Sequence, residues 1–144
     1  MKNIRRLTIA SIIIVYIVIL AGATVRMTGS GMGCPDWPKC FGYLIPPTDR
    51  SDIEWEKNHN YKKNQIIIFN DSLIYANKDF KSIDYIGREN WSNYTKHDYS
   101  KFNVYHTWIE YINRLIGAIA GLSVLILFIN SLKFFKKRKS ITLL

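Results

Sequence analysis

The run LTIASIIIVYIVILAGATV, from Leu7 to Val25, contains no charged residue. At about 1.5 Å of rise per residue, a helix of this length crosses the ~30 Å hydrocarbon layer of a membrane. A second charge-free run, LIGAIAGLSVLILFINSL, occupies residues 115–132, and we expect its helix to begin earlier, near Tyr105. The sequence therefore predicts transmembrane helices at residues 7–25 and 105–132.

The basic residues gather on the outer flanks of these two helices. The formal net charge is +9, with lysines and arginines clustered in residues 1–6 and 133–144, whereas residues 27–109 hold ten basic and ten acidic side chains. The positive-inside rule places such flanks in the cytoplasm and the neutral segment, residues 26–104, on the extracytoplasmic side. Because the clusters are short and lie next to the membrane, we expect no nucleic-acid partner.

These patterns predict an all-α protein of the inner (cytoplasmic) membrane, with both termini in the cytoplasm and a long extracytoplasmic loop. A cleaved signal peptide is the alternative for the first helix, because residues 21–23 could form a cleavage site, although the apolar run is longer than usual. Residues 27–47 have the Gly, Pro and aromatic content of turns, and residues 48–103 contain one strand-like run, Gln65–Phe69. An apolar run resumes at residues 141–144, as if a third span began there.

The two cysteines, Cys34 and Cys40, both lie in the segment assigned to the outside. Oxidising conditions there favour a disulfide, and two of the five intervening residues are prolines that can hold the ends close. A structural disulfide is the first hypothesis, and a redox-labile pair beside a reaction site is the alternative. A zinc site lacks further ligands nearby, and a thioredoxin-like motif needs a shorter spacing.

Polar residues form a stripe on one face of the second predicted helix. At about 100° per residue, the stripe contains His106, Glu110, Asn113, Gly117 and Gly121. A carboxylate near the membrane boundary is costly unless it faces protein, water or a cofactor, so Glu110 is a functional candidate. An exposed pair with the arginine one turn later is the alternative. The two glycines allow close approach, either by another helix or by a flat macrocycle.

Two segments together resemble the haem A synthases of bacteria and mitochondria. They are VRMTGSGMGCPDWPKCFGYLIPP, residues 25–47, and WIEYINRLIGA, residues 108–118. The resemblance implies the first part of an eight-helix protein made of two four-helix bundles, which oxidises the methyl group of haem O to the formyl group of haem A. It further implies haem b in the second half, and haem O synthase and an electron-transfer protein as partners beside the lipid bilayer, with a homo-oligomer left open.

The resemblance also implies roles for particular residues. Glu110 matches an essential carboxylate, and the cysteines match a pair above the substrate haem, so Asn113, Arg114, Gly117 and Gly121 become candidate haem contacts. The family places an axial histidine where this chain has Asn113, and a carboxamide is a poor iron ligand. His106 on the same stripe is the candidate axial ligand, and the alternative is a solvated His106 with the ligand on another helix.

Two other functions stay open on the sequence alone. One is a non-catalytic two-span scaffold or assembly subunit, and the other is a membrane-tethered thiol oxidoreductase that uses the two cysteines. Haem absorption by the purified protein would distinguish a haem A synthase from these two alternatives. Electron transfer to a dithiol substrate would identify the thiol oxidoreductase.

Overall fold

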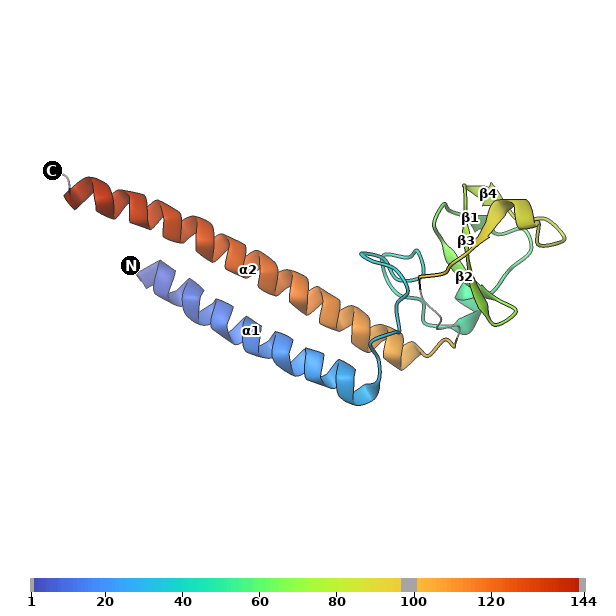
Figure 1. Ribbon diagram of the computed structural model, residues 1–144, viewed down its shortest axis with the longest axis horizontal. Helices are drawn as coiled ribbons and strands as arrows, with labels where there is room; N and C mark the ends of the chain where they lie inside the picture. The colour runs from blue at the N-terminus through green and yellow to red at the C-terminus, as the bar shows by residue number, and fades with distance from the viewer. Residues whose placement is uncertain (1, 97–100, 143–144) are drawn as a thin grey trace. The chain divides into compact units, whose positions relative to one another are not determined.

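The computed structural model describes residues 2–96 and 101–142. It contains two long helices, α1 (Lys2–Thr28) and α2 (Val104–Thr142), with short strands and turns between them (Figure 1). The chain divides into two compact units: a helical unit formed by residues up to 24 and from 112 onward, and a loop unit formed by Val25–Tyr111.

Both long helices are apolar enough to cross a membrane. The qualifying stretches are Asn3–Thr28, with mean hydropathy 2.5, and Val104–Lys133, with mean hydropathy 2.3. Only 6% of each apolar window is buried, so these side chains face outward, as lipid-facing side chains do and the core helix of a soluble protein does not. Both predicted spans are therefore present as helices, and each helix extends beyond the predicted bounds.

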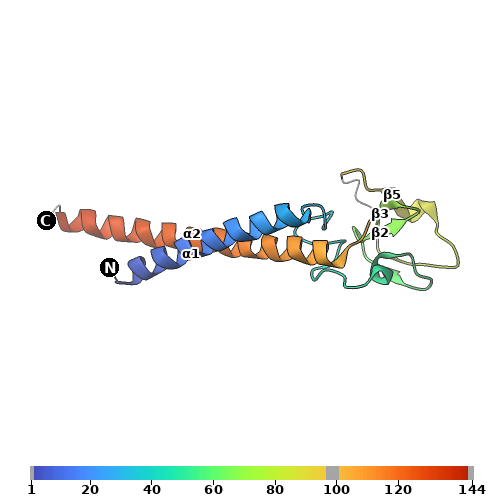
Figure 2. The ribbon, with the colours of Figure 1, turned by 90° about the horizontal axis from the view of Figure 1, so that it is seen from below.

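Each of these two helices has a small buried residue. Ser11 on α1 and Ala120 on α2 are buried, at 4% and 8% exposure, while most of their neighbours are exposed. Figure 2 shows α1 passing beside α2. Small side chains let two helix backbones come close, which is how helices commonly pack in membranes.

The loop unit contains antiparallel sheet, so the all-α prediction is wrong for this part of the chain. One sheet has three strands in the order β2 (Ile66–Phe69), β3 (Ser72–Ala76) and β5 (Trp91–Asn93), and the other pairs β1 (Asn60–Tyr61) with β4 (Phe80–Lys81). Two 3-10 helices, η1 (Arg50–Ile53) and η2 (Arg88–Asn90), complete it. The strand-like run at 65–69 is confirmed as β2, whereas the other strands were not predicted from the sequence.

A two-residue turn explains why β2 and β3 form a hairpin. Asn70 and Asp71 both have positive φ, 49° and 56°, and they connect Phe69 to Ser72 in direct register. Tight hairpins favour such turns because their twist matches that of the strands, and Asn and Asp adopt positive φ more readily than most residues. The hairpin signal was therefore present in the sequence.

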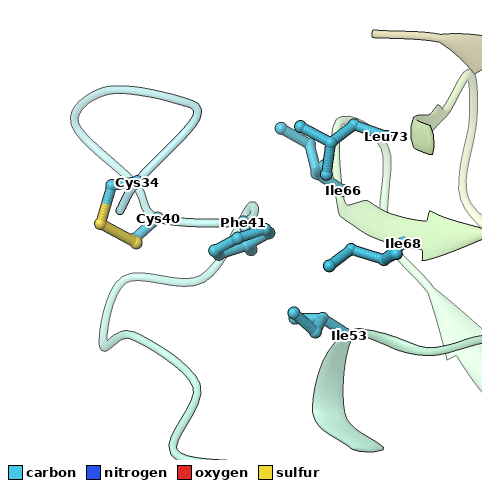
Figure 3. Close-up of a cluster of buried hydrophobic side chains, with 7 residues drawn as sticks. All are labelled: Cys34, Cys40, Phe41, Ile53, Ile66, Ile68 and Leu73. Atoms are coloured by element: carbon cyan, nitrogen blue, oxygen red, sulfur yellow. A yellow bond between two sulfur atoms is a disulfide. The ribbon is translucent and has the colours of Figure 1, made fainter. Parts of the chain in front are cut away.

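Both faces of the three-stranded sheet are buried. Its first face joins the cysteine loop in one hydrophobic cluster, called here the disulfide cluster: Cys34, Cys40, Phe41, Ile53, Ile66, Ile68 and Leu73 (Figure 3). Ile67 and Ile74 point to the opposite face and pack with Tyr61, Ala76 and Trp91. Successive strand residues alternate between faces, so the continuous isoleucine run of β2 fits a strand covered on both sides.

Candidate functional site

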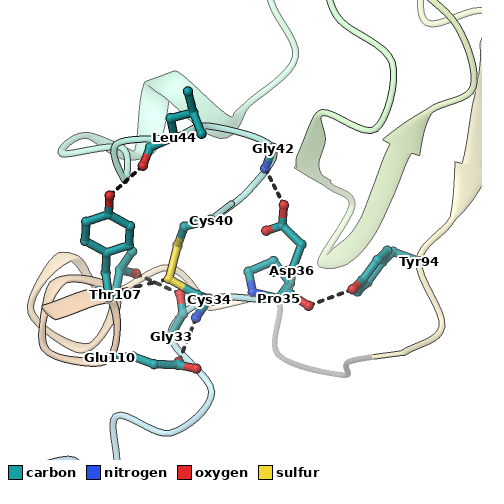
Figure 4. Close-up of a disulfide and its surroundings, with 11 residues drawn as sticks. Gly33, Cys34, Pro35, Asp36, Cys40, Gly42, Leu44, Tyr94, Thr107 and Glu110 are labelled. Atoms are coloured by element: carbon teal, nitrogen blue, oxygen red, sulfur yellow. Dashed lines mark hydrogen bonds between the residues drawn. A yellow bond between two sulfur atoms is a disulfide. The ribbon is translucent and has the colours of Figure 1, made fainter. Parts of the chain in front are cut away.

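Glu110 lies in the first turns of α2, in the part of that helix that belongs to the loop unit. Its side chain is buried, at 7% exposure, and Oε2 accepts a hydrogen bond from the backbone N–H of Cys34 at 2.9 Å (Figure 4). A buried carboxylate needs hydrogen-bond donors, because otherwise it loses its hydration without replacement. The structure therefore brings Glu110 together with the cysteine loop, two features that the sequence singled out separately.

Thr107, one turn before Glu110, contacts the same segment of chain. It is completely buried, and its hydroxyl donates to the backbone carbonyl of Gly33 at 3.0 Å. Its own carbonyl oxygen lies 3.6 Å from Cys34 Sγ. We count this last approach as a contact and not a hydrogen bond, because a disulfide sulfur carries no proton.

Cys34 and Cys40 form a disulfide, as the first hypothesis predicted. The sulfurs are joined to each other, so they are not ligands of a metal here, and no cluster of metal-ligating side chains occurs among the described residues. Cys34 is 2% exposed and Cys40 is fully buried. Exchange with an external thiol requires access to a sulfur atom, so this burial disfavours the thiol oxidoreductase hypothesis.

Hydrogen bonds hold the cysteine loop on several sides. The N–H of Gly42 donates to Asp36 Oδ2 at 2.9 Å, and the Tyr94 hydroxyl donates to the carbonyl of Pro35 at 2.6 Å (Figure 4). Backbone bonds in both directions join Cys40 to Tyr43. The loop is thus a rigid element built into the core of the loop unit.

Tyr43 connects this loop to the sheet. Its hydroxyl donates to the carbonyl of Asp52 at 3.0 Å and accepts from the Gln65 amide at 2.6 Å. Burial raises the pKa of Tyr43, the negative charge of Asp52 raises it further, and the bond from Gln65 lowers it. The phenol therefore stays protonated at physiological pH and acts as a structural hydrogen-bonding group.

A cavity of ≈570 Å³ also opens beside the cysteine loop. Its walls include Trp37 and Lys39 from the loop, together with Ile66 and Tyr75 from the sheet. Glu110 is not among its lining residues. The cavity therefore contributes no support to the role predicted for that carboxylate.

The other candidate residues of α2 belong to the helical unit. Asn113 and Arg114 are half-buried, and a Cβ atom added at Gly117 or Gly121 would meet nothing within 4 Å in the described structure. Close packing of another described helix therefore does not explain these two glycines. The surface beside them has room for a partner helix or a flat ligand.

His106 occupies the start of α2. Its backbone N–H donates to Asn103 Oδ1 at 3.3 Å, and the N–H of Tyr105 donates to the same oxygen at 3.0 Å, so Asn103 caps the helix. The His106 side chain is half-buried. These contacts explain its backbone position and leave its predicted role as an iron ligand untested.

Gly33 and Thr107 contact the site but were not singled out as site residues from the sequence. Gly33 is buried, and a Cβ atom there would lie 2.5 Å from the backbone carbon and oxygen of His106. Thr107 precedes Glu110 by three residues, a helical spacing that could have marked it as a neighbour of the carboxylate. No comparable spacing marked Gly33. A glycine is needed there because the backbone of His106 and Thr107, more than seventy residues away in the sequence, leaves no room for a Cβ atom.

Comparison with known proteins agrees with the resemblance found in the motifs. Haem A synthase of Shewanella oneidensis is 40% identical over 43 residues, which are 30% of this chain and 13% of that protein. Haem A synthase of Shouchella clausii is 46% identical over 57 residues, 38% of this chain and 19% of that protein. Haem A synthase of Lysinibacillus sphaericus is 41% identical over 54 residues, 38% of this chain and 18% of that protein.

The matched part of the chain spans less than a fifth of the length of these relatives. No solved structure matches it. A family model described as "cytochrome oxidase assembly protein" matches residues 5–144, which is almost the whole chain. The chain therefore belongs to the haem A synthase family of membrane proteins, designated COX15-CtaA.

Proposed function

We propose that this chain is the amino-terminal part of a haem A synthase, which oxidises the methyl group of haem O to the formyl group of haem A for cytochrome oxidase. The observation that carries the proposal is the buried carboxylate of Glu110, hydrogen-bonded beneath the disulfide loop at 2.9 Å from Cys34 N. The relatives named haem A synthase support the reaction. An enzyme that supplies haem O and a protein that accepts electrons are the expected partners.

Conversion of a methyl group and one water molecule into a formyl group releases four protons and four electrons, so the reaction needs water as the oxygen source, an electron acceptor and a proton acceptor near the reacting carbon. A carboxylate held by a backbone N–H can take up a proton without leaving its position, which suits general-base catalysis. We assign this role to Glu110. The disulfide is assigned a structural role, because both of its sulfurs are buried.

The substrate haem would lie along the stripe of α2 that follows Glu110. Gly117 and Gly121 leave open space beside the helix, as a flat macrocycle requires, and Asn113 and Arg114 offer polar contacts. The family's axial histidine is replaced by Asn113, so His106 is our candidate iron ligand, and a histidine outside this chain is the alternative. The described residues therefore offer space and polar contacts for the haem ring, but the expected histidine ligand for its iron is missing from position 113.

We also propose that the loop unit lies on the extracytoplasmic side, because the basic flanks of the two helices favour the cytoplasm. A cysteine introduced at Asp52 should react with a membrane-impermeant thiol reagent in intact cells. A cysteine introduced at Ser140 should react only after the cells are opened. The reverse pattern would contradict the orientation and would place the disulfide on the cytoplasmic side.

Replacement of Glu110 by Ala in the full-length protein should abolish haem A formation, because the reaction loses its proton acceptor. The measurement is chromatography of haems extracted from cells that make haem O but have no other haem A synthase. A loss of at least about a hundredfold is expected for a general base. A second variant, His106→Ala, tests whether His106 is an iron ligand. Its haem A formation is measured in the same way, and the absorption spectrum of the purified variant reports the ligation of the haem iron.

Glu54→Ala is the matched control for Glu110→Ala, because Glu54 is an exposed glutamate that pairs with Arg50 on the surface. It should leave haem A formation unchanged. Full activity of Glu110→Ala would contradict the assigned role, and an unchanged haem spectrum in His106→Ala would eliminate that ligand. Absence of haem A even with the unmodified full-length protein would favour the non-catalytic assembly subunit.

A further inference from the structure

One peptide group is held at both of its ends by neighbouring side chains of α2. The carbonyl of Gly33 accepts a hydrogen bond from Thr107 Oγ1 at 3.0 Å, and the N–H of Cys34 donates to Glu110 Oε2 at 2.9 Å (Figure 4). These two groups belong to the same peptide unit, whose C=O and N–H point in opposite directions. Thr107 and Glu110 stand one helical turn apart, so they can reach both ends at once.

Gly33 makes this close approach possible. A Cβ atom at this position would lie 2.5 Å from the carbonyl carbon and oxygen of His106 and 2.7 Å from the N atom of Thr107. All of these are backbone atoms of α2, which cannot rotate away as a side chain can. The absence of a side chain therefore lets the peptide lie flat against the helix.

We propose that Thr107 and Gly33 are positioning residues, which set the orientation of the Glu110 carboxylate through the Gly33–Cys34 peptide. The proposal rests on the function proposed above for Glu110, and it assigns to its neighbours the task of holding it. Thr107 fixes the carbonyl end of the peptide, and this fixes the direction of the N–H at the other end. The carboxylate then accepts a charge-assisted hydrogen bond from a donor that cannot turn away.

All three residues that form these hydrogen bonds are buried, so the bonds are difficult to replace. Thr107 is 0% exposed, Cys34 is 2% exposed and Glu110 is 7% exposed, so water has little access to replace a lost bond. The disulfide holds Cys34 from the other side, since Cys40 belongs to the disulfide cluster. Loss of the Thr107 hydroxyl would therefore alter the hydrogen bond to Glu110, because water cannot take the place of the lost bond.

The test compares Thr107→Val with Thr107→Ser in the full-length protein. Valine keeps the shape of threonine but removes the hydroxyl, and serine keeps the hydroxyl. Thr107→Val should lower the kcat for haem A formation about tenfold, the scale of one lost hydrogen bond in a buried site. Thr107→Ser should restore most of the activity.

Tyr94→Phe is the matched control. It also removes a hydroxyl that donates to a carbonyl of the cysteine loop, that of Pro35, but this carbonyl does not belong to the peptide that Glu110 binds. We expect nearly unchanged kcat for this variant. Equal losses in Thr107→Val and Tyr94→Phe, or equal losses in Thr107→Val and Thr107→Ser, would overturn the proposal.

Hydrogen exchange of the Cys34 amide separates this proposal from the proposed function. Thr107→Val should speed the exchange of that amide by about tenfold, because its peptide is no longer held at the carbonyl end. Unchanged exchange would overturn the positioning role whatever the activity. Faster exchange together with full activity of Glu110→Ala would instead contradict the catalytic role of Glu110 and retain the contact with the peptide.

Discussion

Replacement of Gly33 by Ala is expected to destabilise the loop unit by roughly 3 kcal/mol or more, which combines overpacking with the loss of two buried hydrogen bonds. The added Cβ would lie 2.5 Å from the backbone of His106, far inside van der Waals contact. Since neither backbone can yield cheaply, the segment carrying Gly33 must move away from α2. This movement would separate the peptide from Thr107 and Glu110, so haem A formation should be lost together with stability.

Gly31→Ala supplies the matched control for this substitution. A Cβ atom at Gly31 would approach only Val25 Cγ1, at 3.7 Å, which is an ordinary contact. Thermal unfolding of the full chain in detergent, followed by tryptophan fluorescence, should show a much lower midpoint for Gly33→Ala and a nearly unchanged one for Gly31→Ala. Similar midpoints for the two variants would mean that the close approach of Gly33 to α2 is not maintained in solution.

The sequence was sufficient to predict the parts of the fold that depend on local pattern. Two charge-free runs of membrane-spanning length predicted α1 and α2, because apolar length alone distinguishes such helices. The disulfide was predictable because Cys34 and Cys40 are close in sequence and two prolines stiffen the segment between them. Each of these inferences needs no knowledge of distant contacts.

The sheets were harder to predict from the sequence. β1 and β4 have two residues each, too few for alternation to be visible in the sequence. The isoleucine run of β2 did predict one strand, but it does not alternate, because both faces of its sheet are covered, so it did not indicate which residues pack against it. The turn residues Asn70 and Asp71 are the signal in the sequence that indicates the hairpin, because Asn and Asp adopt positive φ readily.

Only half of the candidate site could be predicted from sequence. Helical periodicity placed Glu110 on a polar stripe, and a carboxylate near the membrane boundary is costly unless it faces protein, water or a cofactor. The donor that binds it is a backbone N–H, which every non-proline residue carries, so no residue type could reveal that Cys34 supplies it. Thr107 became recognisable only when its partner, the carbonyl of Gly33, was located in space.

Phe41 joins the cysteine loop to the sheet, and its replacement by Ala should cost about 3–5 kcal/mol of unfolding free energy, as for other fully buried phenylalanines. Phe41 is 1% exposed and lies in the disulfide cluster (Figure 3). Its ring meets that of Phe102 edge to face, with centroids 5.9 Å apart. Its carbonyl also accepts a hydrogen bond from the N–H of Ile66 at 3.2 Å, a contact that Ala would retain.

The backbone conformation at position 41 makes Phe41→Ala a direct measure of the stability contributed by packing of the ring. Its φ of 56° is strained for any residue with a Cβ, so Phe and Ala bear the same strain and the difference between them reports packing. The unfolding midpoint should fall by more than roughly 10 °C, whereas Tyr85→Ala, which removes a 66% exposed ring, should change it little. Equal midpoints for the two variants would show that the cysteine loop is not packed on the sheet. The support that this packing gives to the peptide beside Glu110 would then be absent.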